Sequence, residues 1–149
     1  MTRPDYTRTA PDLTRKLLAF TRALRDTAIP DRLRELVNVR VSQMNGCAYC
    51  TDTHIKHAKD FGETDQRLHH LAVWRDSPLF DATEKAALLW AETLTHLPKT
   101  GVSDDIYQTA SRAFDEKVLV ELTYVVITIN AWNRASVAFR LAPGKHDRA

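Results

Sequence analysis

The chain has 149 residues, 44% apolar and 27% charged, which is enough for one domain with a sizeable hydrophobic core. Its formal net charge of +2 is too small to indicate a nucleic acid or an anionic membrane as partner. The N-terminus shows no apolar segment of a secretory signal, and no stretch reaches the length of a membrane span, so we expect a cytoplasmic protein.

Glycine and proline divide the chain into stretches in which apolar residues repeat at helical spacing. This spacing predicts four helices in the first half, at about residues 13–28, 31–44, 47–61 and 63–76. Pro30 suits the start of the second helix, and Asn45-Gly46 ends it. Three further helices are expected at about residues 87–97, in a short segment capped by Ser103 or Asp104, and at about residues 115–139.

The segment Tyr124–Ile129 is rich in β-branched residues and is also compatible with a strand. No other segment offers a partner strand, so we predict a fully buried helix there. The expected fold is therefore all-α, with about seven helices in one domain.

The two cysteines of the chain form a Cys-Ala-Tyr-Cys tetrad, Cys47 to Cys50, and His54 follows one helical turn later. Residues three and four apart share a helical face, so the two thiols and the imidazole are expected to lie together. The free N–H groups and the dipole at a helix start favour a thiolate, and an imidazole can take the thiol proton. Because the second thiol can then close a disulfide, the pattern indicates dithiol redox chemistry.

Two other interpretations compete with redox chemistry. A zinc site would use Cys47, Cys50, His54 and His57, but on one helix the first and last of these are about 15 Å apart along the axis. Zinc needs all its ligands within about 2.3 Å of one point, so two ligands would have to come from elsewhere. Two inert core cysteines are the other interpretation, which the nearby histidine disfavours. We therefore expect no metal.

Glu35 lies twelve residues before Cys47, about 18 Å away if the helix were unbroken. Only a reversal of the chain at Asn45-Gly46 would bring the two together. From the residues alone, Glu35 is a solvated helix charge paired with Arg32 or another basic neighbour.

The string Glu35-x(11)-Cys47-x-x-Cys50-x(3)-His54 resembles the signature of the AhpD-like alkylhydroperoxidases of the carboxymuconolactone decarboxylase superfamily. The segments 39–47, 88–94 and 129–134 are similar too, and the resemblance covers about residues 13–140. It implies an AhpD-like all-α bundle that assembles as a trimer or hexamer. We accordingly expect one such domain over residues 1–149.

The resemblance also implies a role for each site residue in a peroxide-reducing enzyme. Cys50 would attack the peroxide, His54 would be its general base, Glu35 would assist the proton relay, and Cys47 would be the resolving thiol. The implied partners are a peroxide substrate and an external dithiol reductant such as a lipoyl group, and no cofactor is implied.

One position departs from the family pattern. The best-known members carry a second histidine directly before the peroxidatic cysteine, where this chain has Tyr49. A phenol, with a pKa of about 10, is a poor base near neutral pH but can donate a hydrogen bond.

Two alternative functions stay open. A lactone decarboxylase of the same superfamily works by acid–base chemistry and needs no thiol pair, so the Cys47 and Cys50 spacing speaks against it. A non-catalytic redox sensor or assembly module would use the disulfide to alter a partner interface. Sustained turnover of peroxide separates an enzyme from a sensor, which reacts once.

Overall fold

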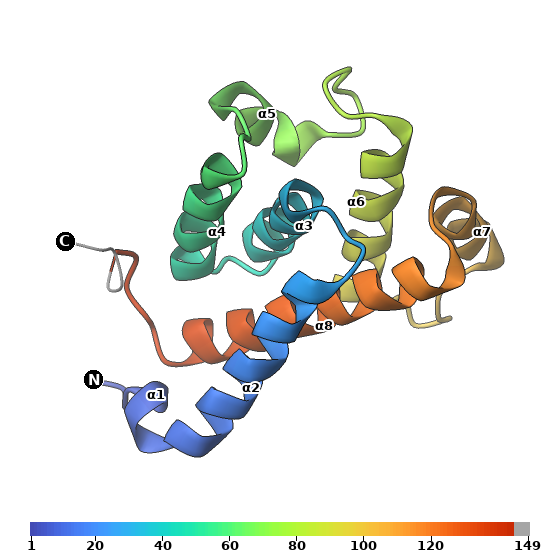
Figure 1. Ribbon diagram of the computed structural model, residues 1–149. Helices are drawn as coiled ribbons and strands as arrows, with labels where there is room; N and C mark the ends of the chain where they lie inside the picture. The colour runs from blue at the N-terminus through green and yellow to red at the C-terminus, as the bar shows by residue number, and fades with distance from the viewer. Residues whose placement is uncertain (145–149) are drawn as a thin grey trace.

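The computed structural model describes residues 1–144, and every regular element in that range is helical (Figure 1). The α-helices are α1 (Tyr6–Thr9), α2 (Pro11–Ala23), α3 (Asp31–Met44), α4 (Ala48–Asp60), α5 (Asp65–His70), α6 (Ala82–Thr95), α7 (Asp104–Ala113) and α8 (Glu116–Ala138). Two short 3₁₀ helices, Leu24–Asp26 and Leu71–Val73, extend α2 and α5. None of the helices in this range combines the length and apolar character needed to cross a bilayer.

The predicted all-α fold is confirmed, and most predicted boundaries lie within a few residues of the observed ones. The short helix α1, capped by Asp5, was not predicted because four residues are too few to show a helical repeat. The ambiguous segment Tyr124–Ile129 is helical, in the middle of α8. The prediction that it is fully buried was wrong, because Tyr124 is 47% and Ile127 52% exposed.

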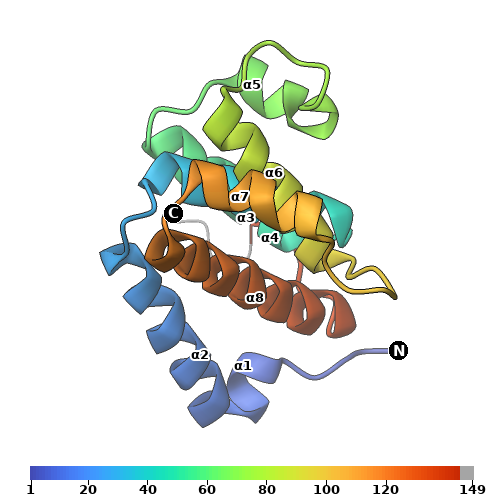
Figure 2. The same ribbon diagram turned by 90° about the vertical axis from the view of Figure 1, so that its right-hand side faces the viewer.

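Helix α3 lies at the centre of the bundle and packs against α4, α6 and α8 (Figure 1). Helix α8 runs beneath these three, and α2 crosses it on the side that faces the viewer in Figure 1. In the view turned by 90°, α5 lies at one end of the molecule and α1 and α2 at the other (Figure 2). The central position of α3 allows one helix to contribute both to the core and to a site beside α4.

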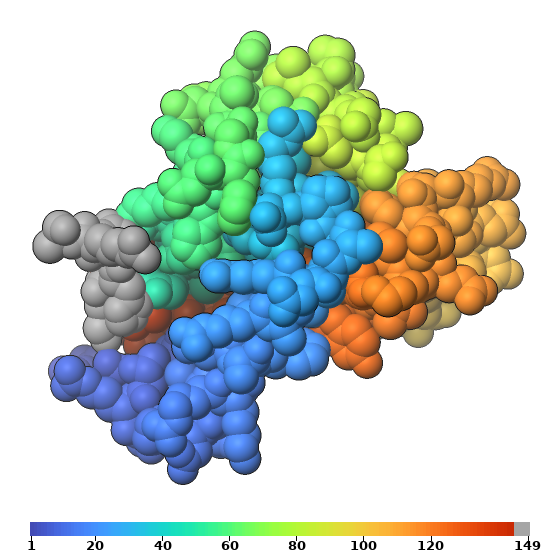
Figure 3. All heavy atoms as spheres, viewed as in Figure 1, coloured from blue at the N-terminus to red at the C-terminus, as the bar shows by residue number. Residues whose placement is uncertain are grey.

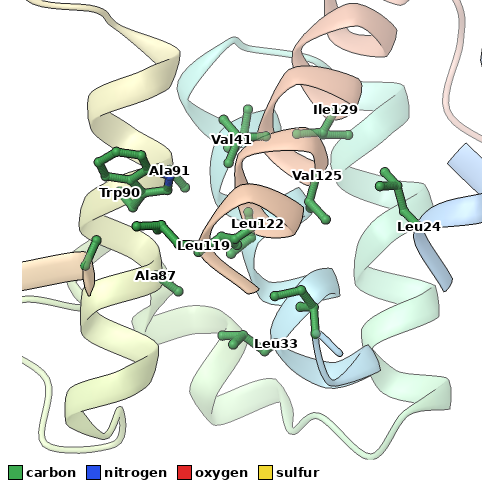
Figure 4. Close-up of a cluster of buried hydrophobic side chains, with 14 of the residues drawn as sticks. Leu24, Leu33, Val41, Ala87, Trp90, Ala91, Leu119, Leu122, Val125 and Ile129 are labelled. Carbon is green, nitrogen blue, oxygen red and sulfur yellow. The ribbon is translucent and has the colours of Figure 1, made fainter. Parts of the chain in front are cut away.

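The main hydrophobic core forms where α3, α6 and α8 meet (Figure 4). Val41 of α3 lies beside Ile129 of α8, and Ala87 and Ala91 of α6 are fully buried against the same cluster. Removing such side chains from water stabilises a fold by roughly 1.5–3 kcal/mol for each residue of Val, Leu or Ile size. Trp90 belongs to this core and satisfies its indole N–H by donating to Thr123 Oγ1 at 3.0 Å.

A partly buried network of amides fastens the end of α3 to α8. Asn45 donates to Asn130 Oδ1 and to Asn133 Oδ1, both at 2.9 Å, and Asn133 donates to Ser42 Oγ at 3.0 Å. Asn133 is 1% exposed, so these contacts satisfy polar groups that water cannot reach. The network fixes the turn that leads from α3 into α4.

An ion cluster joins α5 to α6 and to the start of α3. Arg67 donates to Glu63 Oε1 at 2.7 Å and to Glu84 Oε1 at 2.5 Å. Arg32 was expected to pair with Glu35. Its Nε instead lies 3.8 Å from Glu63 Oε2, and its Nη2 lies 3.7 Å from Glu84 Oε1. The Glu63 side chain is fully buried, so its charge depends on these two guanidinium groups.

We predict that Arg67→Met lowers the free energy of unfolding by about 3 kcal/mol, because it leaves two buried carboxylates without their closest cation. Urea unfolding followed by tryptophan fluorescence measures the change. The matched control is Arg15→Met, which breaks the exposed pair Arg15–Asp12 and is expected to leave stability unchanged. Equal effects of the two substitutions would contradict the importance of the cluster.

Candidate active site

The two cysteines lie at the start of α4, where they form a disulfide with a Cα–Cα distance of 5.3 Å. Cys47 is the N-cap residue, one position before the first turn, and its Sγ accepts the Cys50 N–H at 3.2 Å. Gly46 precedes it with φ +64°, a left-handed conformation that favours glycine and turns the chain out of α3. The prediction that both cysteines lie together at a helix start is therefore confirmed.

Glu35 and His54 meet between α3 and α4. His54 Nδ1 lies 2.6 Å from Glu35 Oε2, and the Glu35 residue is only 5% exposed. The interpretation of Glu35 as a solvated charge was wrong, because the turn at Asn45-Gly46 folds α4 back along α3. Two residues nineteen positions apart thus become hydrogen-bond partners.

The charges around Glu35 favour its ionised form. Burial of this carboxyl opposes ionisation, but the hydrogen bond from His54 and the positive charges of His54, His57 and Arg34 lower its pKa below the ordinary 4.5. A carboxylate only accepts hydrogen bonds, so Nδ1 of His54 carries the shared proton. The other ring nitrogen, Nε2, is then the basic one in neutral His54.

His57 is a further member of this group that was considered only as a metal ligand beside the cysteines. Its Nδ1 lies 3.9 Å from Glu35 Oε2, and its ring stands edge-on to that of His54 with the centroids 5.6 Å apart. Burial lowers the pKa of His57, the positive charges of His54 and Arg25 act in the same direction, and Glu35 acts against them. The His-x-x-His spacing on α4 was the signal in the sequence, since residues i and i+3 share a helical face.

A cavity of about 390 Å³ opens beside Cys50 and His54. Its wall is mostly apolar or aromatic and includes Leu18, Tyr49 and Trp132. Cys50 belongs to this wall, whereas Cys47 is not among the described residues that line it. In the surface view, the dark-red end of α8 shows between α4 and the blue N-terminal helices, so this region lies between segments distant in sequence (Figure 3).

A tryptophan fixes the outer side of this cavity. Trp132 of α8 donates its indole N–H to Thr21 Oγ1 of α2 at 2.8 Å, and both residues line the cavity. The cavity is thereby bounded by α2, α4 and α8, and one of the two thiols faces it.

A model of the carboxymuconolactone decarboxylase family matches residues 11–93, more than half of the chain. The chain belongs to this family. The predicted resemblance to its AhpD-like members is confirmed by the match together with the similar structures.

Two relatives match nearly the whole length of this chain. The chain is 37% identical over 136 residues to the uncharacterized protein YdfG of Bacillus subtilis, covering 91% of this chain and 92% of that one. The crystal structure of ATU0492 from Agrobacterium tumefaciens, a protein of unknown function with a proposed AhpD role in antioxidant defence, has a TM-score of 0.91 at 31% identity. That match covers 96% of this chain and 98% of the other.

A more distant structure shares the fold alone. The AhpD core of a peroxidase-related protein from Ralstonia eutropha superposes with a TM-score of 0.82 at 18% identity, covering 93% of this chain and 74% of that chain. The helical arrangement of the family is therefore retained where most residues differ.

We predict that the Glu35 carboxylate makes stability depend on pH. Its pKa is lower in the folded protein than in the unfolded chain, so its stabilisation is present above about pH 4.5 and is lost as the pH falls through the folded-state pKa. Glu35→Gln is therefore expected to be less stable than the native protein at pH 7, with a difference that shrinks below pH 4.5.

Urea unfolding at a series of pH values between 3 and 7 measures this difference. Asp76→Asn, which removes an exposed carboxylate in a loop, is the control for the loss of one surface charge. A Glu35→Gln difference that is independent of pH would contradict the lowered pKa.

Proposed function

We propose that the protein is a dithiol oxidoreductase that reduces organic hydroperoxides. The observation that carries this proposal is that Cys50 and His54 line the same cavity. Cys50 is bonded to Cys47, and Glu35 orients His54. A nucleophile, a base and a group that orients the base are the elements expected of an activated thiol.

The first step uses Cys50 as the attacking thiol. Its backbone N–H lies in the first turn of α4, where the helix dipole stabilises a thiolate. His54 Nε2 takes the thiol proton, and the thiolate sulfur attacks the terminal oxygen of the hydroperoxide. The O–O bond breaks as the S–O bond forms, and the leaving alkoxide takes the proton from His54. The products are an alcohol and a sulfenic acid on Cys50.

The second step uses Cys47 as the resolving thiol. Its sulfur attacks the Cys50 sulfenic acid, an S–S bond forms, and the hydroxyl leaves as water with the Cys47 proton. The resulting bond is the Cys47–Cys50 disulfide of the structure. An external dithiol, such as a lipoyl group, then exchanges with this disulfide and is itself oxidised to a cyclic disulfide. The cycle involves no cofactor.

Tyr49 occupies the place of the family's second histidine and lines the same cavity. In the proposed cycle its hydroxyl donates a hydrogen bond to the peroxide or to the leaving oxygen and does not act as a base. The base function rests on His54 alone, with Glu35 holding the required tautomer.

We further propose that the protein acts in the cytoplasm as a homo-oligomer, a trimer or a hexamer as in the AhpD-like members it resembles. Apolar side chains on the outer faces of α2 and α8 support this, since Phe20, Val120, Tyr124 and Ile127 are between 41% and 55% exposed. Burying these faces against another copy would remove them from water.

The decisive experiment is consumption of cumene hydroperoxide by purified protein with excess dihydrolipoamide. We expect many peroxide molecules reduced per chain. Cys50→Ser is expected to abolish the reaction, whereas Cys47→Ser should allow one attack and leave a sulfenic acid that dimedone traps at Cys50.

Two further variants test the roles of the base and its orienting group. His54→Ala should move the pH dependence of thiol alkylation to higher pH, because the imidazole supports the ionised thiol. Glu35→Gln should slow peroxide consumption less than His54→Ala does, because Glu35 acts through His54. Consumption of a single equivalent would instead indicate a sensor, and dimedone labelling of Cys47 in the Cys50→Ser protein would reverse the two thiol assignments.

We predict that the apolar wall of the cavity sets a preference for bulky hydroperoxides. Leu18→Trp narrows the cavity from the α2 side and is expected to lower kcat/KM for cumene hydroperoxide about tenfold while leaving hydrogen peroxide reduction little changed. Leu13→Trp is the matched control, since Leu13 also lies on α2 but is 70% exposed and outside the cavity wall. Equal losses for the two peroxides would contradict entry through this cavity.

A further inference from the structure

Three groups that commonly ligate metals converge beside the disulfide without including either cysteine. One ligand atom each from Glu35, His54 and His57 lies within 4.8 Å of the others. Glu35 comes from α3, and the two histidines are one helical turn apart on α4. The proposed redox cycle uses Glu35 and His54 but leaves His57 without a role.

We propose that Glu35, His54 and His57 form a binding site for a divalent transition-metal ion of the zinc class, and that the bound ion inhibits the thiol chemistry. Metal binding here is independent of the proposed peroxide reduction, and only the inhibition rests on it. This ligand set differs from the cysteine-containing set that the sequence disfavoured.

The geometry suits a site with two histidines and one carboxylate. Glu35 Oε2 lies 2.6 Å from His54 Nδ1 and 3.9 Å from His57 Nδ1. Two ligand atoms of a tetrahedral zinc ion, each about 2.0–2.1 Å from the metal, are separated by roughly 3.3 Å. All three ligand atoms lie within 4.8 Å of one another, so the side chains would have to rotate to reach this separation, and the fourth position would remain for water.

Two cavities reach the proposed ligands. Glu35 and His57, but not His54, line one of about 280 Å³, whose other charged groups come from Asp31, Asp60, Arg25 and Arg34. All three ligands line a smaller one of about 70 Å³, together with Arg25 and Arg34. A dication therefore passes the carboxylates of the larger cavity but meets two guanidinium groups beside its ligands. Arg34 Nε lies only 3.6 Å from Glu35 Oε1, and its positive charge opposes that of the metal ion. We therefore expect the ion to bind reversibly and not to be held permanently.

Coordination would remove the base from the redox cycle. In the absence of metal, the proton of neutral His54 lies on Nδ1, toward Glu35, and Nε2 is free to accept the thiol proton. A metal ion on Nδ1 displaces that proton to Nε2, so the nitrogen that faces the reaction becomes a donor. Cys50 then has no acceptor for its proton, and the attack on peroxide slows.

The binding test uses zinc sulfate and the oxidised protein, because the Cys47–Cys50 disulfide keeps the thiols from competing for metal. Isothermal titration calorimetry should show about one zinc ion per chain. His57→Asn should weaken binding at least tenfold, whereas the matched control His96→Asn, at the end of α6 and outside the cluster, should bind as the native protein does. Absence of binding, or equal binding by both variants, would overturn the site.

The inhibition test follows a single turnover of pre-reduced protein, with the reductant removed, at increasing zinc. Each protein is compared with its own rate in EDTA. The zinc concentration for half inhibition should rise at least tenfold in His57→Asn and stay unchanged in His96→Asn. Equal inhibition of all three proteins would assign the effect to the thiols and overturn the proposed inhibition. If the protein reduces no peroxide, the calorimetric result still decides whether the metal site exists.

Discussion

The hydrogen bond between Glu35 and His54 constrains the whole region around the disulfide. It joins α3 to α4 across a turn of three residues and lies in a place from which water is largely excluded. Because the Glu35 carboxylate can only accept hydrogen bonds, it determines which nitrogen of His54 is basic. The same pair holds α4 so that Cys50 and His54 line one cavity. The proposed redox chemistry, the proposed orientation of the base and the proposed metal site thus depend on one contact.

This contact needs support from outside the two helices. Asn45 ends α3, and its amide is held by Asn130 and Asn133 of α8, which lie eighty-five and eighty-eight positions further along the chain. Gly46 then takes the left-handed conformation that starts the reversal. These amides set the direction of the turn, and the turn sets the distance between Glu35 and His54. The long helix α8 therefore contributes to the site without supplying a reacting group.

Local rules were sufficient for most of the fold and for three of the five residues of the site, Cys47, Cys50 and His54. Helical spacing and the boundaries at Pro30 and Asn45-Gly46 predicted α3 and α4, and the i, i+3 and i, i+4 rules brought Cys47, Cys50 and His54 to one face. The same rules failed for Glu35, because its environment is created by another helix, and from its own neighbours it is an ordinary surface charge. The contact of His57 with Glu35 could not be predicted for a related reason. Its partner across the site is Glu35 and not a cysteine on its own helix.

The segment Tyr124–Ile129 shows a further limit of local reasoning. Its β-branched composition was compatible with a strand, and the lack of a partner strand elsewhere correctly predicted a helix. The apolar composition was, however, taken to mean burial on all sides. The helix buries Val125, Val126 and Ile129 while Tyr124 and Ile127 face outward. Sequence periodicity cannot distinguish an apolar face on the outside of a helix from one that packs in the core. The difference depends only on whether another part of the protein, or another copy of it, covers that face.

The wall that α2 adds to the cavity differs physically from the wall formed by α4 and α8. None of the residues of α1 or α2 is buried, although Thr21 contacts Trp132 and Phe20 packs edge-on against Tyr124. A segment with so little buried surface is expected to open away from the bundle at a smaller free-energy cost than global unfolding, once the Trp132–Thr21 hydrogen bond breaks. The cavity therefore has one side, formed by α4 and α8, that carries the proposed site, and one side, formed by α2, that is held by fewer buried residues. If copies of the chain associate through α2 and α8, assembly would raise the cost of that opening and so regulate how quickly bulky molecules exchange with solvent.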